Sequence, residues 1–273
     1  MDKINHRDLL LTIFFLYNSS ESIKIWNLNN FECILKIQII NEAFNPLASC
    51  FLNLSNEIIL LVIPSYKPLY VENTNPKKMK IVDLEENVIK EIEGTDKNIE
   101  NCIITYYDEQ FKTNYIIAGT ELCITSYNYE KNIIHKKYKI KNKKYNSENG
   151  LTHLMLMIYN NGKKIQLFDS CSDGNLRIWD FHKAKLLHDI IVIEYRFFCP
   201  SIKYFSFTFN DEENIFVAYG EQQIFLVNLK FGIIIDTINA YRDEVVYVKK
   251  IKIEKYDILI SLGESIIFWQ IYD

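Results

Sequence analysis

The sequence lacks the closely spaced ligands with which proteins usually hold a metal ion. Its 6 cysteines are scattered without a CxxC pair, and its 5 histidines form no HExxH or comparable pair. Because a zinc site needs four converging ligands, usually from such pairs, the sequence predicts no metal site. Most of the cysteines interrupt apolar, strand-like runs, which indicates reduced core residues and therefore a cytoplasmic protein.

The motifs of common enzyme classes are also missing. The sequence contains no GxSxG, no GxxxxGK[ST] and no GxGxxG, and no serine lies beside an identifiable base. These patterns mark activated serines, phosphate-binding loops and dinucleotide sites. The sequence therefore predicts neither an enzyme nor a bound cofactor.

Strong positive charge and a membrane-spanning run are absent as well. With 31 Lys and Arg against 35 Asp and Glu, the net charge is −4, which supplies no basic field for nucleic acid. Residues 9–17 are apolar, but this run is too short to cross a bilayer as a helix. Residues 18–21 do not form a signal-peptide cleavage site. We therefore expect residues 9–17 to form a buried strand, and we expect no membrane insertion.

What the sequence does have is the composition of a β protein with a sizeable core. Hydrophobic residues make up 48% of it and aromatic residues 14%, including 18 Tyr and 17 Phe. Aromatic and β-branched side chains fit a half-buried pleated surface, so they favour strands. No stretch of helical periodicity interrupts them.

One pattern recurs along the whole chain. A strand of alternating character ends in a bulky residue, which we call the anchor, and in most copies Asp or Asn follows it. All 3 tryptophans of the chain are anchors. Neighbouring anchors are 42 to 56 residues apart, which fits a four-stranded propeller blade plus loops of variable length. The anchors are Trp26, Val82, Tyr127, Trp179, Val227 and Trp269.

The intervals between anchors resolve into four short strands each. Between Trp179 and Val227 we predict strands at Leu186–Ile193, Tyr204–Phe209, Ile215–Ala218 and Gln223–Leu229. Many short, evenly spaced strands are typical of a radial β repeat. The sequence thus predicts an all-β fold, a β-propeller.

Residues 170–180, SCSDGNLRIWD, resemble the end of a WD repeat. In that family a loop His, a strand Ser, a turn Asp and the Trp form a hydrogen-bonded network. Asp173 and Trp179 match it, Ser170 or Ser172 could supply the serine, and the Gly-His pair is missing. The resemblance extends over nearly the whole chain, with one strongly marked unit, and implies a WD-repeat (transducin-like) β-propeller with residues 1–273 as a single domain.

The strand count bears on how such a ring would close. Residues 32–271 hold five complete four-strand units, and only two strands precede them. Six blades would close if residues 1–8 supplied another strand and a partner or the N-terminus completed the last blade. We therefore expect six blades, with an incompletely closed ring as the open alternative.

The resemblance implies that docking takes place on loops at one face of the propeller. Two of these loops share a Tyr-Arg pair, and others carry lysines and tyrosines; the alternatives are that the pairs seal blade junctions and the lysines are solvated. We expect a non-catalytic scaffold for other proteins or peptides, with two alternatives: a substrate-receptor subunit of a ubiquitin ligase or another complex, and an enzyme acting at the central channel. The expected docking residues are Tyr66, Lys144, Tyr145, Tyr195, Arg196, Phe197, Tyr241 and Arg242.

Overall fold

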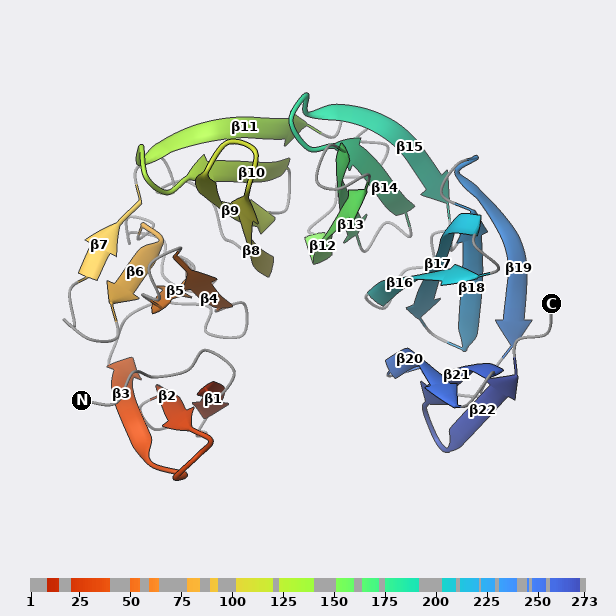
Figure 1. The fold of residues 1–273 in the computed structure, drawn as a ribbon, viewed down its shortest axis with the longest axis horizontal. Helices are drawn as coiled ribbons and strands as arrows, with labels where there is room; N and C mark the ends of the chain where they lie inside the picture. Colours follow the sequence, from red (N-terminus) through yellow and green to blue (C-terminus); the bar gives the residue numbers. More distant parts are fainter. Residues whose placement is uncertain are drawn as a thin grey trace, which may run out of the picture. The chain divides into compact units, whose positions relative to one another are not determined.

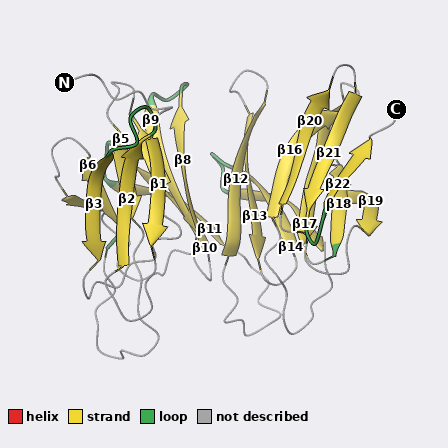
Figure 2. Ribbon diagram, turned by 90° about the horizontal axis from the view of Figure 1, so that it is seen from below, coloured by secondary structure: helices red, strands yellow, loops and turns green. Residues whose placement is uncertain are grey.

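The computed structural model is all-β: among the residues it describes there is no helix, and the strands form antiparallel sheets (Figures 1 and 2). The described residues accordingly contain no helix that is long and apolar enough to cross a membrane. The structure describes residues 9–14, 21–39, 50–54, 59–63, 78–83, 89–92, 102–119, 123–139, 151–159, 164–171, 175–191, 203–209, 212–220, 222–228, 231–239, 245, 247–253 and 256–270.

The chain divides into two compact units, and the first is Met1–Lys139. It holds three sheets, each with its strands in sequence order. The first sheet consists of β1 (Leu9–Phe14), β2 (Glu21–Asn27) and β3 (Cys33–Ile39). The second consists of β4 (Cys50–Asn53), β5 (Ile59–Ile63), β6 (Lys80–Asp83) and β7 (Ile89–Glu91), and the third of β8 (Cys102–Asp108), β9 (Thr113–Gly119), β10 (Cys123–Asn128) and β11 (Ile133–Lys139).

The second unit, Ile140–Asp273, also holds three sheets with strands in sequence order. The fourth sheet consists of β12 (Leu151–Tyr159), β13 (Lys164–Cys171), β14 (Asn175–Asp180) and β15 (Lys185–Ile191). The fifth consists of β16 (Lys203–Phe209), β17 (Glu212–Gly220), β18 (Gln223–Asn228) and β19 (Ile233–Asn239). The sixth has β20 (Tyr247–Ile253), β21 (Tyr256–Leu262) and β22 (Ile266–Gln270).

The predicted strand count is confirmed for the described residues. Two strands, β1 and β2, precede five successive groups of four, and the sheets at the two ends of this series have three strands each. The four strands predicted between Trp179 and Val227 are all present, with ends that differ by up to three residues. The run expected to be a buried strand rather than a signal peptide contains β1.

The repeat is visible in backbone detail as well as in sequence. In four sheets, the strand that follows the anchored strand carries one extra residue opposite the anchor, which is a β-bulge. In the same four sheets, the residue five positions after the anchor has a positive φ between 50° and 66°. These four residues are Phe31, Asn132, Ala184 and Gly232.

The Asp or Asn that follows the anchor forms a hydrogen bond in the next turn, which explains its recurrence. In these four sheets its side-chain oxygen accepts a hydrogen bond from a backbone N–H two or three residues later, at 2.8–3.2 Å. This local bond stabilises the turn that leads into the next strand. The acceptors are Asn27, Asn128, Asp180 and Asn228.

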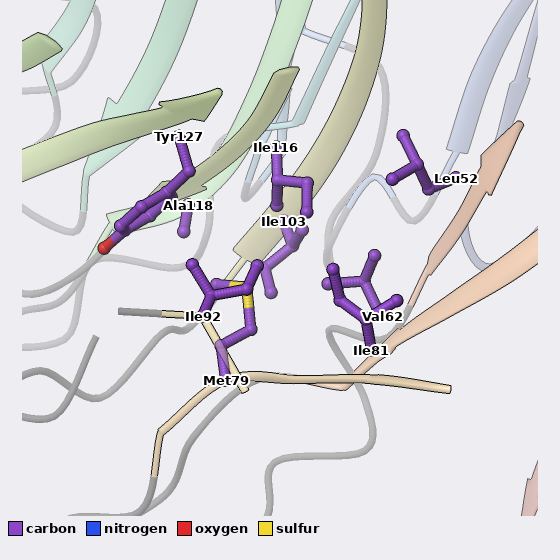
Figure 3. Close-up of a cluster of buried hydrophobic side chains, with 9 residues drawn as sticks. All are labelled: Leu52, Val62, Met79, Ile81, Ile92, Ile103, Ile116, Ala118 and Tyr127. Atoms are coloured by element: carbon purple, nitrogen blue, oxygen red, sulfur yellow. The ribbon is translucent and has the colours of Figure 1, made fainter. Parts of the chain in front are cut away.

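In each unit, one pair of consecutive sheets packs face to face through a cluster of buried residues. In the first unit, Met79 and Ile81 of the second sheet lie in one cluster with Ile116 and Tyr127 of the third (Figure 3). Met79 and Ile81 are three and one residues before the anchor Val82, whereas Tyr127 is itself an anchor. The earlier sheet thus packs through the face opposite its anchor side chain, and the following sheet packs through the face that carries its anchor.

The same arrangement occurs in the second unit. Ile224 and Leu226, three and one residues before the anchor Val227, pack in a cluster with Leu259 and the anchor Trp269 of the sixth sheet. The agreement of two separate interfaces indicates that the sheets stack by one rule. The apolar residues within these strands form the cores of the two units.

Cys33, Cys50, Cys102 and Cys123 are free thiols. The prediction that they are core residues is wrong for Cys33, which is exposed at the start of β3. Cys50 is partly buried, and desolvation raises the pKa of its thiol to about 12. Its thiolate is therefore scarce near neutral pH.

Gly232 is the one residue of the four turns that must lack a side chain. A Cβ there would lie 2.4 Å from Nδ1 of His188, on the outer strand of the preceding sheet. Positive φ alone does not require glycine, since Ala184 adopts it at the equivalent place. We expect Gly232→Ala to lower the free energy of unfolding by about 1–3 kcal/mol, because the His188 ring must move.

A double-mutant cycle in urea checks this cause. In a His188→Ala background the cost of Gly232→Ala should fall below about 1 kcal/mol, because the clash is gone. An equal cost in both backgrounds would show that backbone conformation, not the close approach to His188, requires the glycine.

Candidate interaction surfaces and the anchor network

The predicted docking residues all lie outside the described residues. They are Tyr66, Lys144, Tyr145, Tyr195, Arg196, Phe197, Tyr241 and Arg242. Asp173, the predicted turn member of the WD-type network, also lies outside them. Their roles therefore stay predictions.

The six anchors are all on strands of the structure, and four of them are buried. Val82, Tyr127, Trp179 and Val227 are buried, whereas Trp26 and Trp269 are half-buried. Each anchor stands on the strand that is third from the start in a four-stranded sheet or its equivalent in the two shorter ones. This confirms the repeat pattern as a pattern of strands.

Trp179 has a partner that the sequence did not point out. Its indole Nε1 donates a hydrogen bond to Oδ2 of Asp169, a fully buried carboxylate on the neighbouring strand β13. The resemblance implied that Trp179 shares a network with Asp173 and with Ser170 or Ser172, but it named no acceptor for the indole. The acceptor is Asp169, because β13 and β14 pair so that Leu167 lies opposite Trp179 and Asp169 lies two residues further along β13.

The same carboxylate meets a buried cation. Nη1 of Arg177 lies 3.3 Å from Oδ1 of Asp169, and both side chains are almost completely buried. On the other side, Nε of Arg177 lies 3.6 Å from Oδ1 of Asp189, which also accepts a hydrogen bond from Nδ2 of Asn175. A buried guanidinium needs such carboxylates, since an unpaired charge in this place would be costly.

The sixth sheet repeats the arrangement with a neutral acceptor. Nε1 of Trp269 donates to Oγ of Ser261 at 2.7 Å, and Ser261 is fully buried. Leu259 lies opposite Trp269, so Ser261 stands two residues beyond it, as Asp169 stands two beyond Leu167. The two indoles thus use one position of the repeat for their hydrogen-bond acceptor.

Register extends this relation to the other four sheets. In the first sheet Leu10 pairs with Trp26, which places Thr12 at the acceptor position. The anchors that are not tryptophan have an apolar residue there. Those residues are Ile63, Ala118 and Ala218. A buried indole N–H needs an acceptor, whereas a valine anchor carries no donor, which explains why the two positions change together at the tryptophan and valine anchors.

A different feature sets the sixth sheet apart from the third, fourth and fifth. Ile266 and Phe268 of β22, three and one residues before the anchor, are 60% and 61% exposed. The residues at the first of these positions in the third, fourth and fifth sheets, Ile124, Leu176 and Ile224, are fully buried. The sixth sheet therefore shows to solvent an apolar surface that its counterparts cover.

The exposed surface continues across the three strands. Leu262 lies opposite both Ile266 and Tyr247 in the strand pairing, and both Leu262 and Tyr247 are exposed. The other face of this sheet carries Leu259 and Ser261, which are buried. One face is thus a core and the other is an apolar surface, which we call the sixth-sheet surface: Tyr247, Leu262, Ile266 and Phe268.

Exposed aromatic residues also stand in turns. Phe31 and Phe231 occupy turns after anchored strands, and Phe111 lies in the turn between β8 and β9. Single exposed aromatic residues are common on protein surfaces. The sixth-sheet surface differs from them because its apolar residues are contiguous across three strands, whereas the exposed Ile233 and Ile235 near Phe231 lie along the single strand β19.

Comparisons with known proteins agree with the fold and add no family. No family model matches the sequence, and no curated protein matches it. The solved structures include a computationally designed protein, Ika8, with a TM-score of 0.61 at 14% identity over 96% of this chain and 71% of that one. The designed protein Ika4 has a TM-score of 0.46 at 14% identity, over 66% of this chain and 96% of the designed one. The Ika8 similarity concerns the fold alone.

Proposed function

We propose that this protein is a non-catalytic interaction scaffold and that its six sheets are the blades of a WD-repeat-type β-propeller. The observation that carries the scaffold is the sixth-sheet surface, where Ile266 and Phe268 are largely exposed. Proteins without a binding partner seldom expose a contiguous apolar surface. Burying such a surface against a partner removes it from water, which favours association. Stacked sheets provide a rigid support for such a surface.

The propeller rests on the repeated details of the sheets. The bulge, the Asx turn and the acceptor position recur in register, which is what copies of one structural unit require. Two interfaces between consecutive sheets also follow one rule of packing. Radial stacking of such units places the anchor face of one sheet against the preceding sheet, and an incompletely closed ring leaves the sixth-sheet surface free.

The predicted docking loops supply the binding surface that we propose to test first. Tyr195-Arg196 and Tyr241-Arg242 combine rigid aromatic rings with guanidinium groups, a combination enriched at binding hot spots. Exchanging both arginines for alanine should reduce partner recovery strongly while leaving the melting temperature nearly unchanged.

Affinity purification of the full chain from its native cells tests the proposal. We expect the wild-type chain to recover a stable, stoichiometric set of proteins, and the Arg196→Ala/Arg242→Ala variant to lose them. A wild-type chain that is recovered alone, at the size of a monomer, would contradict the scaffold. A folded double variant that keeps all its partners would contradict only the docking loops.

A further inference from the structure

Basic residues are concentrated on one strand of this acidic chain. Residues 131–144 contain 7 of the 31 Lys and Arg and none of the 35 Asp and Glu. This stretch includes β11, the outer strand of the third sheet (Figure 1). Four of its lysines lie in the described part of the chain, and we call them the β11 lysines: Lys131, Lys136, Lys137 and Lys139.

The core holds β11 in a fixed register. Tyr138 is fully buried and pairs with Ile124 of β10, and Ile134 packs against the apolar cluster of the second and third sheets. A strand whose apolar residues are buried cannot shift by one residue without exposing them. Lys137 and Lys139, on either side of Tyr138, are exposed and therefore stand on a backbone whose position is set.

The charge of the β11 lysines is not neutralised by their neighbours. None of the four forms an ion pair with another residue that the structure describes. The carboxylate of Glu130, next to Lys131, instead accepts hydrogen bonds from the backbone N–H and Nδ2 of Asn114 at 2.7–3.1 Å. Alternate residues of a strand are about 7 Å apart, which is within the screening length of about 8 Å at physiological salt. The potentials of Lys137 and Lys139 therefore add.

The fold itself does not require lysine at these places. In register, the place of Lys136 is taken by Asp236 in β19. The place of Lys137 is taken by Asp189 in β15. Charged residues, lysine above all, do protect outer strands from pairing with other chains, but β19 has a single charged residue. Protection of the edge thus explains neither the number nor the common sign of the charges on β11.

The charge of the rest of the chain limits which anions fit this surface. Outside residues 131–144 the chain has 24 Lys and Arg against 35 Asp and Glu, a net charge of −11. A nucleic acid or an anionic membrane would extend over the remainder and meet charge of its own sign. A short anionic segment contacts the lysines alone.

We propose that the β11 lysines bind a short acidic segment of a partner protein, with several Asp or Glu side chains within about ten residues, the length that an extended chain needs to span β11. Lysines on a strand of fixed register lose less freedom on binding than lysines on a free chain would. The inference rests on the proposed scaffold function and names the chemical class of one partner.

Fluorescence anisotropy with a labelled octaglutamate peptide tests this, and octaglutamine serves as the uncharged control peptide. The full-length chain should bind octaglutamate and not octaglutamine. Raising the NaCl concentration from about 50 to about 300 mM should weaken the binding of octaglutamate by about tenfold, because the charges on both partners are screened.

A pair of matched variants locates the site. Lys131→Gln/Lys137→Gln/Lys139→Gln should weaken the binding of octaglutamate by at least about fivefold, as the loss of three exposed charge pairs implies. The control variant makes the same exchange at exposed lysines of three other sheets: Lys36→Gln, Lys185→Gln and Lys249→Gln. It should change the binding by less than about twofold, because only the total charge differs. Both variants should melt near the wild-type temperature, since all six side chains are exposed.

Three results would overturn the proposal. Octaglutamate does not bind, or the two triple variants weaken its binding equally, which would leave only a general effect of net charge. Alternatively, a short oligothymidylate or phosphatidylserine vesicles bind more tightly than octaglutamate through the same lysines, which would assign the surface to nucleic acid or to a membrane. None of these results decides the scaffold itself, which the affinity purification tests separately.

Discussion

Replacing Asp169 with alanine is expected to lower the free energy of unfolding by about 3–5 kcal/mol, the cost of breaking a buried ion pair from one side. The carboxylate accepts from the indole of Trp179 and pairs with Arg177, and all three side chains are buried. Its removal leaves a buried cation with a weaker remaining partner, Asp189, and an indole N–H without its acceptor. Urea unfolding followed by circular dichroism measures the loss.

Two further variants separate the ion pair from mere loss of volume. Asp169→Leu with Arg177→Met removes both charges, so it should be clearly more stable than Asp169→Ala. Asp236→Ala removes an exposed carboxylate from β19 and should change stability by less than about half a kcal/mol. A loss below about 1 kcal/mol for Asp169→Ala would show that the network contributes little.

Trp179→Ala is the second change with a large expected effect, again about 3–5 kcal/mol, because a buried indole leaves a large cavity. Its side chain is 2% exposed and packs within the fourth sheet. Phe268→Ala, which also truncates an aromatic residue before the end of an anchored strand, should cost under about half a kcal/mol. Thermal unfolding compares them.

Trp179→Phe divides the effect into its parts. Phenylalanine restores most of the volume but has no N–H for Asp169, so its cost should lie between those of alanine and wild type. A Trp179→Ala variant that melts within a degree or two of the wild type would mean that the anchor positions are not the buried centres of the repeat.

Much of the fold could be predicted because the repeat is written in local patterns. The Asp or Asn that follows most anchors made the repeat recognisable, and the structure shows that it accepts a turn hydrogen bond at Asn128 and Asp180. Alternating apolar residues indicated the strands in the same way. These signals lie within a few residues of one another, so they can be read without knowing which strands pair.

Asp169 escaped prediction for the opposite reason. Its role follows from pairing between β13 and β14, which brings it beside a tryptophan ten residues later. A search of the sequence for polar residues ahead of each Trp would have found Thr12, Asp169 and Ser261, but only register shows that they share a position. Cys33 was misjudged similarly, because a strand-like run does not reveal which of its residues lie at an exposed end.

Counting strands left the last blade one strand short unless the N-terminus or a partner completed it, and the sixth sheet has three strands among the described residues. The four-residue spacing between Ile134 and Tyr138 of β11, and between their counterparts in β15 and β19, could not be predicted, because a bulge sets it. Bulges are properties of paired strands rather than of single segments.

The central claim is that six repeated sheets form one propeller domain. Pulsed hydrogen exchange with mass spectrometry, carried out across a urea gradient, tests it most directly, since it follows Met1–Lys139 and Ile140–Asp273 separately in the intact chain. If the sheets form one ring, both segments should lose protection together at one urea concentration, because each blade is supported by its neighbours. Loss of protection in one segment while the other remains folded would contradict the single propeller.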